Sequence, residues 1–238
     1  AIVEDANNNG NFINNDATDS EVVFSGAEYD DVFTKDVTDY ANDFINAFNN
    51  DTAYTLPADI IVKQSLTLPE GKSFELDLNG KTISAINSIS DKNNDGKLTS
   101  ADNVVFIDVR GNLTVKNGTM TLKHTGDNYG WNACTELFYV AGNGVLNIED
   151  ATIENLGGSD MAYVVDMVNA TDITVNVANS TLKSTYIPFR VFNNGSGMNN
   201  VTSNNSTLEG VSRAFWVHIY SNADNHGKGV KSSTLSLD

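Results

Sequence analysis

Short apolar segments recur along the chain, and each belongs to a unit of the same layout. A unit holds a short apolar strand, a turn rich in Gly and Asn, and a later strand that contains a small residue, a threonine and an apolar residue in succession. Steps of about 26 to 33 residues separate the units, which is typical of stacked-repeat proteins. The pattern predicts a chain that coils, with each coil lying on the one before. The five triplets are Gly118-Thr119-Met120, Ala151-Thr152-Ile153, Ser180-Thr181-Leu182, Ser206-Thr207-Leu208 and Ser233-Thr234-Leu235.

The strand pattern begins near residue 58 and is clearest over residues 74–83. Phe74, Leu76 and Leu78 alternate with the acidic residues Glu75 and Asp77. Alternation with a period of two directs apolar side chains to one face of a strand and polar side chains to the other. The Asn-Gly pair that follows is a strong tight-turn signal. Residues 58–83 are therefore expected to form the first strands of the stack.

One segment has helical periodicity, and it precedes the strands. Apolar residues fall on one face of a helix predicted over residues 38–50. Asp36 or Thr38 can cap its start, and Asn49-Asn50 can end it. A lone amphipathic helix here would cover the open end of the stack, where unpaired strand edges invite association. The chain thus divides into an Asn-rich N-terminal arm (1–35), without repeats, and a repeat region (36–238). The apolar helical residues are Val37, Tyr40, Ala41, Phe44, Ile45 and Phe48.

The string from Leu68 to Ile83, LPEGKSFELDLNGKTI, together with the preceding helix, resembles the opening coils of the right-handed parallel β-helix family, the pectate-lyase-like fold. The resemblance covers roughly residues 37 to 238. It implies an all-β fold, a right-handed parallel β-helix with an N-terminal capping α-helix. It implies no particular activity, because this fold hosts lyases, hydrolases, phage spikes and adhesins alike.

Residues 91–102 match a twelve-residue calcium loop inserted between coils. Oxygen-bearing side chains occupy positions 1, 3, 5, 9 and 12, Gly96 occupies position 6, and position 7 would contribute a backbone carbonyl. The sequence therefore predicts one bound Ca²⁺ that fixes the loop. The loop resembles the dockerin version, with Asp at position 12, but it has no second copy and runs directly into a strand, so docking to a cohesin-type partner is not implied. The predicted ligands are Asp91, Asn93, Asp95, Lys97, Thr99 and Asp102.

Charge and cysteine content narrow the classes of partner. The 238-residue chain has a formal net charge of −17. This charge disfavours nucleic acid and anionic membranes, which need clustered Lys and Arg. No apolar run approaches the ~20 residues of a membrane span. Cys134 is the single cysteine, so no intrachain disulfide forms, and its apolar neighbours predict a buried, inert thiol. A start at Ala1 without Met fits an exported protein whose signal peptide has been removed, or a trimmed chain.

No catalytic residue is predicted. A pectate-lyase-like site would need a carboxylate cluster and an Arg base on one face of the stack. Arg190 and Arg213 are the candidates in the late coils, but their nearest acids in the sequence, Asp166, Asp172 and Glu209, lie at positions that do not obviously line up with them. The chain is therefore expected not to be an enzyme. A carboxylate cluster beside either arginine would revive the enzymatic interpretation.

Two further sets of residues are candidates for surface chemistry. Trp216, His218 and Tyr220 alternate along one strand, and they form either a sugar-stacking stripe or part of the core. Asn-x-Ser/Thr triplets recur in the repeat region as candidate glycan acceptors, although Asn is also favoured at tight turns. The predicted acceptors are Asn112, Asn117, Asn169, Asn179, Asn200 and Asn205.

Two functions from different classes follow. The first is an extracellular structural or adhesive surface protein, a calcium-stabilised β-helix that self-assembles in a cell-envelope layer, sheath or filament. This resembles the adhesin-like and cell-envelope β-helix proteins of bacteria and archaea, and implies partners that are further copies of the chain or surface glycans. The alternative is a carbohydrate-active β-helix, either a polysaccharide lyase or a glycan-binding or phage-spike module.

Overall fold

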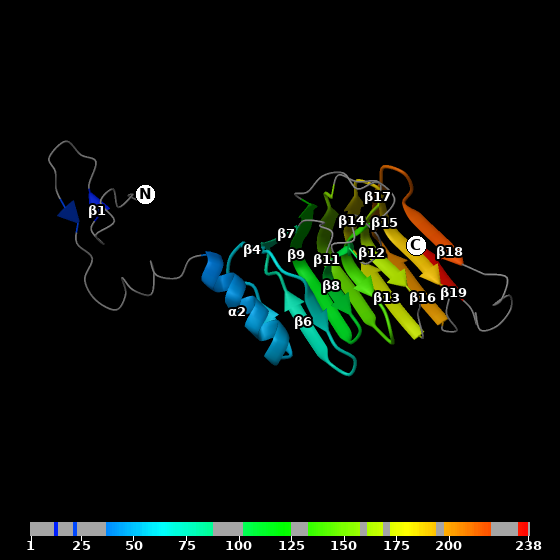
Figure 1. Ribbon diagram of the computed structural model, residues 1–238, viewed down its shortest axis with the longest axis horizontal. Coiled ribbons are helices and arrows are strands. Elements are labelled where there is room, and N and C mark those ends of the chain that lie inside the picture. Colours follow the sequence, from blue (N-terminus) through cyan, green and yellow to red (C-terminus); the bar gives the residue numbers. More distant parts are fainter. Residues whose placement is uncertain are drawn as a thin grey trace.

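In the described part of the chain, the computed structural model has a helix that is followed by a stack of parallel strands (Figure 1). The strands form two large sheets, so the expected all-β class with one N-terminal helix is confirmed. No helix in the described part of the chain is long and apolar enough to cross a membrane. The described residues are 12–13, 21–22, 37–87, 102–124, 133–157, 161–168, 172–193, 198–219 and 233–237.

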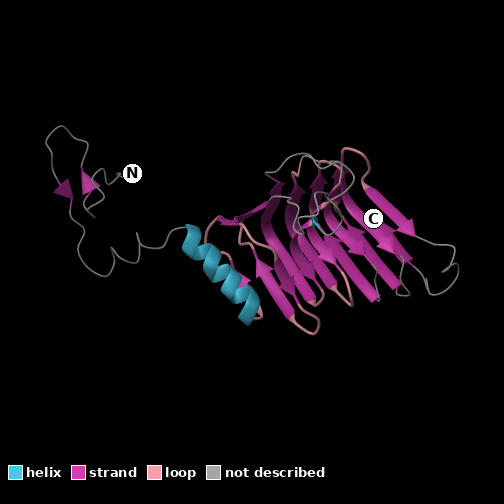
Figure 2. Cartoon of the chain, viewed as in Figure 1, coloured by secondary structure: helices cyan, strands magenta, loops and turns pink. Residues whose placement is uncertain are grey.

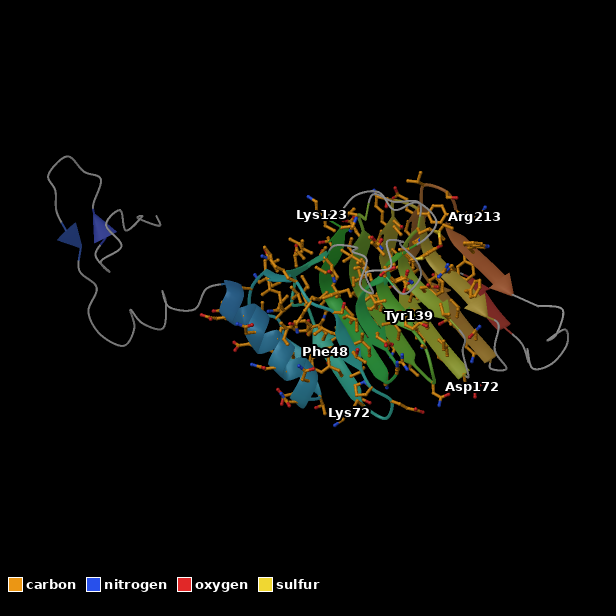
Figure 3. All side chains as sticks on the ribbon, viewed as in Figure 1. Phe48, Lys72, Lys123, Tyr139, Asp172 and Arg213 are labelled. Carbon is orange, nitrogen blue, oxygen red and sulfur yellow. The ribbon has the colours of Figure 1, made fainter. Side chains whose placement is uncertain are left out.

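Helix α2 (Val37–Asn50) begins one residue before the predicted position and ends at the predicted residue. Its buried face includes Phe44 and Phe48, and the Phe48 ring lies 4.9 Å from the ring of Phe74 in the first coils. At its end the Asn50 side-chain amide donates to the carbonyl of Asn46 at 2.9 Å. The helix lies across one end of the stack, with Phe48 on the side that faces the strands (Figure 3).

The strands fall into two parallel sheets and one separate antiparallel pair (Figure 2). The six-stranded sheet contains β5 (Leu66–Leu68), β8 (Val104–Val109), β10 (Thr135–Val140), β12 (Ala162–Val168), β15 (Ile187–Asn193) and β18 (Phe215–Ile219). The larger sheet contains β3 (Ala53–Thr55), β6 (Ser73–Asp77), β9 (Asn112–His124), β11 (Val145–Asn155), β13 (Asp172–Ala178), β16 (Met198–Asn204) and β19 (Ser233–Leu237), with β4 (Ile60–Val62), β7 (Thr82–Asn87), β14 (Thr181–Ser184) and β17 (Thr207–Gly210) paired beside them. The separate pair is β1 (Phe12–Ile13) and β2 (Glu21–Val22).

From β8 onward the chain alternates between the two sheets, and each pass adds strands next to the previous coil. In the larger sheet, Leu146 of β11 lies in register with Leu113 of β9 and with Val175 of β13. These residues point inward and are fully buried. Inward-facing residues of both sheets form one continuous hydrophobic cluster. The buried residues of α2 belong to this cluster and cover the end of the stack where the first strands lie. Burial of such apolar area contributes about 25 cal/mol per Å² to folding.

One corner of the larger sheet uses a left-handed backbone in four successive coils. Asn117, Asp150, Asn179 and Asn205 have φ angles of 61°, 49°, 51° and 47°, and the strand registers place them in one column. The left-handed conformation costs most L-residues about 1–2 kcal/mol, and Asn and Asp tolerate it best. The recurrence of Asn in the turns is thus a consequence of the backbone at this corner.

The structure shows that the fifth predicted triplet does not occupy the same position in its coil as the first four. The threonines of the first four triplets lie in one column, Thr119, Thr152, Thr181 and Thr207. In contrast, Thr234 lies opposite Asn200 of β16, in a different strand of the coil. A small residue followed by threonine and an apolar residue fits any half-buried strand, so the triplet alone does not specify which strand of the coil it forms.

Candidate functional site

One outward-facing column of the six-stranded sheet is made of charged and aromatic residues on neighbouring strands. Residues at this position are in register on five neighbouring strands, from β8 to β18. Figure 3 shows Tyr139, the member on β10, near the middle of the stack. The column consists of Asp108, Tyr139, Asp166, Arg190 and Trp216.

Arg190 and Asp166 form a two-pronged ion pair at the centre of this column. Arg190 Nε donates to Asp166 Oδ1 at 2.8 Å, and Nη2 donates to Oδ2. Nη1 donates to the Tyr163 hydroxyl at 3.3 Å, and the guanidinium carbon lies 4.1 Å from the centre of the Tyr163 ring. Asp166 is fully buried, and the Arg190 side chain is 11% exposed. The carboxylate thus has its cation, and the cation is stacked on an aromatic face.

Glu136 of β10 adds a second buried carboxyl group to the pair. Its Oε1 accepts from Asn103 Nδ2 at 3.0 Å, and Asn103 Oδ1 accepts from the backbone N–H of Cys134 at 2.9 Å. Its Oε2 is buried and receives no hydrogen bond. Burial, and then repulsion by the adjacent Asp166, raise the pKa of Glu136 well above its ordinary value.

The second oxygen of Glu136 is explained if this carboxyl keeps its proton. A protonated carboxyl is a donor, and the Glu136 carboxyl lies within hydrogen-bonding reach of Asp166. Burial raises the pKa of Asp166 as well, but the hydrogen bonds from Arg190 oppose that rise, so Glu136, which has no cation of its own, is the group that keeps the proton. Glu136, Asp166 and Arg190 together then carry one negative and one positive charge, and both oxygens of Glu136 take part in hydrogen bonds.

Apolar side chains surround these charged groups. Cys134, Tyr163 and Ile187 form a second hydrophobic cluster, against which Tyr186 and Trp216 pack. Burial raises the pKa of the Cys134 thiol, so the expectation of a buried thiol is confirmed and the group is held in its unreactive neutral form. The charged groups of this cluster are thus largely removed from water, and its one guanidinium is already paired with Asp166.

The interpretation that Asp166 does not line up with Arg190 is wrong. The two residues are direct partners in β12 and β15. They are 24 residues apart, about one coil of the stack. The repeat period was the signal that would have found this pair. No signal pointed to Glu136, because its burial depends on what covers the outer face of the sheet.

The other acids near the candidate arginines have different surroundings. Glu209 forms an ion pair with Lys183, 3.1 Å between Nζ and Oε1, and both side chains are largely exposed. The Arg213 guanidinium lies 5.2 Å from the centre of the Trp216 ring. Asp172, at the start of β13, is exposed on the other sheet. None of these residues joins the buried cluster.

The predicted calcium loop lies mostly outside the described residues. Asp102, at its twelfth position, is fully buried and directly precedes Asn103, the partner of Glu136. A buried carboxylate must be paired or bound to metal, and this burial is compatible with a ligand role. In the described residues no three His, Cys, Asp or Glu side chains gather as a metal site. The calcium site stays a prediction. The ligands Asp91, Asn93, Asp95, Lys97 and Thr99 are the ones outside the described part.

The candidate glycan-contact stripe is described at two of its three positions. Trp216 is half-buried and packs on the second cluster. The backbone of His218 lies in register with Phe192, and Tyr220 lies outside the described residues. The stripe stays a prediction.

Three of the predicted glycan acceptors belong to the left-handed corner column, namely Asn117, Asn179 and Asn205. Their amides serve the stack, since Asn205 Nδ2 donates to Asn179 Oδ1 at 2.9 Å. Asn112 is exposed at the start of β9, Asn200 is half-buried in β16, and Asn169 lies outside the described part. Modification of these residues stays a prediction.

Comparison with protein families, with curated proteins and with solved structures gave no match for this chain.

Proposed function

We propose that this chain is a non-catalytic extracellular surface protein, built as a right-handed parallel β-helix that α2 caps at one end. Parallel pairing and the alternation of the chain between two sheets support the coil. Right-handedness follows from the strong preference of parallel crossover connections. The buried cluster around Arg190 supports a structural rather than a catalytic use of its charges.

The proposal of self-assembly is based on the difference between the two ends of the stack, because one end is covered by α2 and the other is exposed. At the first end α2 packs its buried phenylalanines over the strands. At the other end, in the described part of the chain, β18 and β19 each pair on one side only (Figure 1). Val217 in β18 is 44% exposed and Val211 before it is 83% exposed. Exposed edges of this kind pair readily with another chain.

The occupant that we propose for this end is a second copy of the chain. Helix α2 blocks the first end, so continuous head-to-tail stacking is disfavoured. Two copies would meet through their β18 and β19 ends about a two-fold axis, which gives a closed, isologous contact. Larger layers or sheaths would then need side-by-side contacts or surface glycans as further partners.

Calcium has a supporting role in this proposal. When bound, the ion would hold the loop 91–102 through its oxygen ligands, with Asp102 as the ligand nearest to the coils. Asp102 leads directly into β8 through Asn103, and Asn103 bonds to Glu136 of the next coil. A fixed loop would therefore stabilise the contact between these two coils.

Light scattering after size exclusion, with calcium and with chelator, tests the proposal. We expect a dimer mass for the wild-type chain and a monomer mass for Val217→Lys, because a charged residue on an edge strand opposes pairing. Ile61→Lys is the matched control, since Ile61 is equally exposed, at 46%, but lies in β4 near the capped end. A wild-type monomer in both conditions would remove the self-assembly proposal.

A carbohydrate-active β-helix is the second candidate, and the Glu136–Asp166–Arg190 cluster is the observation that favours it. Two carboxyl groups beside an arginine on one face are the constellation that a lyase of this fold would need. Burial of all three groups and neutralisation of Arg190 by Asp166 argue against it. Ultraviolet absorbance of unsaturated uronides, measured across pectins and alginates, decides the question. Absence of release would eliminate the lyase.

A further inference from the structure

The buried cluster contains more acid than its cation can neutralise. Arg190 uses Nε and Nη2 on Asp166 and Nη1 on the Tyr163 hydroxyl. Glu136 receives only the neutral amide of Asn103 on one oxygen, while its other oxygen has no donor. An ionised Glu136 would therefore be a buried charge next to a second carboxylate.

We propose that Glu136 is a proton-operated latch between β10 and β12. The neutral acid donates a hydrogen bond to the Asp166 carboxylate and closes the contact between the two coils. Loss of the proton leaves two adjacent buried carboxylates facing one guanidinium, and the outer face of the six-stranded sheet loosens. This regulation lies within one chain and does not depend on the proposed self-assembly.

Each neighbouring strand contributes a group that faces Glu136 or acts on it. Strand β12 supplies Asp166 and Tyr163, and β15 supplies Arg190. On β8, Asp108 adds negative charge, partly compensated by Arg110, whose Nε lies 3.0 Å from Asp108 Oδ2. The thiol of Cys134 and the phenol of Tyr139, on the same segment as Glu136, remain neutral, because burial raises both of their pKa values. Among the described groups, no second cation is available for an ionised Glu136.

The direction of the pH dependence follows from linkage. The pKa of Glu136 is raised in the fold, so between its ordinary value and its folded value the native state binds one proton more than the unfolded state. The stabilisation is complete below about pH 4.3 and is lost as the pH rises through the folded pKa. One proton corresponds to a tenfold loss in the folding equilibrium constant per pH unit, or roughly 3–5 °C in Tm.

Glu136→Gln separates the proton from the shape of the side chain. The glutamine amide donates to Asp166 in place of the acid proton, and its carbonyl accepts from Asn103. We expect the Tm of this variant to lack the decline with rising pH that the raised pKa of Glu136 predicts for the wild type. Glu149→Gln, an exposed position on β11, is the matched control and should follow the wild type. The latch is refuted if Glu136→Gln retains the wild-type slope, or if it lowers Tm equally at every pH.

The wild-type protein offers a direct test that needs no variant to fold. Carboxyl carbon NMR follows the ionisation of Glu136 itself. We expect its resonance to stay at the protonated position at pH values where an ordinary glutamate is already ionised, and to move only at higher pH. Titration of Glu136 near its ordinary pKa of about 4.3 would overturn the proposal and leave the self-assembly proposal untouched.

Discussion

Each of the two sheets carries a column of polar side chains on its outward face, and the two columns differ in how far water reaches them. On the larger sheet, Thr114, Asn147, Asn176 and Thr202 follow one another in register. Each bonds to its neighbour through a neutral, half-buried side chain, as in the 2.9 Å bond from Asn176 Nδ2 to Asn147 Oδ1. On the six-stranded sheet, the outward column contains Asp166 and Arg190, which are charged and largely removed from water.

The difference shows that the chemistry of an outward-pointing side chain depends on whether other residues bury it, and not only on the face of the sheet from which it points. A neutral ladder at the surface can exchange its hydrogen bonds for bonds to water, so each bond contributes modestly. A buried charge has no such exchange, and its partner becomes indispensable. The two columns should therefore respond very differently to the loss of one member.

Removal of the buried cation should have the largest effect. Arg190→Met keeps much of the side-chain volume but leaves Asp166 as an uncompensated buried carboxylate. We expect a loss of about 3–5 kcal/mol in the free energy of unfolding, measured by urea denaturation. The variant should also recover stability in acid, where Asp166 can be protonated. A loss of less than about 1 kcal/mol would mean that the pair is exposed to solvent.

The sequence predicted the repeats, the helix and the facing of the strands, because these depend on local periodicity. The helix at 37–50 and the inward alternation of Phe74 and Leu76 are examples. The partner of Arg190 could have been found from the spacing of the coils. The burial of Glu136 could not, because it results from tertiary covering that no local pattern encodes. The same limit explains the register of Thr234, whose triplet fits two strands of a coil equally well.

The second largest effect on stability is expected from substitutions at the left-handed corner of the coils. Asn179 has φ 51°, a conformation that glycine adopts freely and alanine does not. Asn179→Ala should lower the free energy of unfolding by about 1–2 kcal/mol, while Asn179→Gly should lower it by much less. Both variants lose the contact with Asn205, so their difference isolates the backbone. Equal thermal midpoints for the two variants would contradict a conformational role.

Removal of one member of the neutral hydrogen-bonded column on the larger sheet should lower the free energy of unfolding less than the removal of Arg190. Asn176 bonds to Asn147 on one side and accepts from Thr202 on the other. Asn176→Ala should lower the free energy of unfolding by about 1 kcal/mol, because water reaches the groups left behind. Thr174→Ala, on the same strand and face, is the control and should change it by less than about 0.5 kcal/mol. A cost as large as that of Arg190→Met would show that the ladder is as desolvated as the cluster.

The smallest effect should come from a second ion pair, which joins neighbouring strands as Arg190 and Asp166 do but is exposed to solvent. Lys183 and Glu209 are partners in register on β14 and β17, 3.1 Å apart, with side chains 44% and 58% exposed. Lys183→Gln should change the free energy of unfolding by only about 0.2–1 kcal/mol, and added salt should remove even that difference, since exposed pairs are screened. The effect of Arg190→Met should persist in the same salt series, because solvent ions do not reach Asp166. If both variants respond equally to salt, then the outer face of the six-stranded sheet is open to water, and the contrast between the two sheets, together with the latch at Glu136, fails.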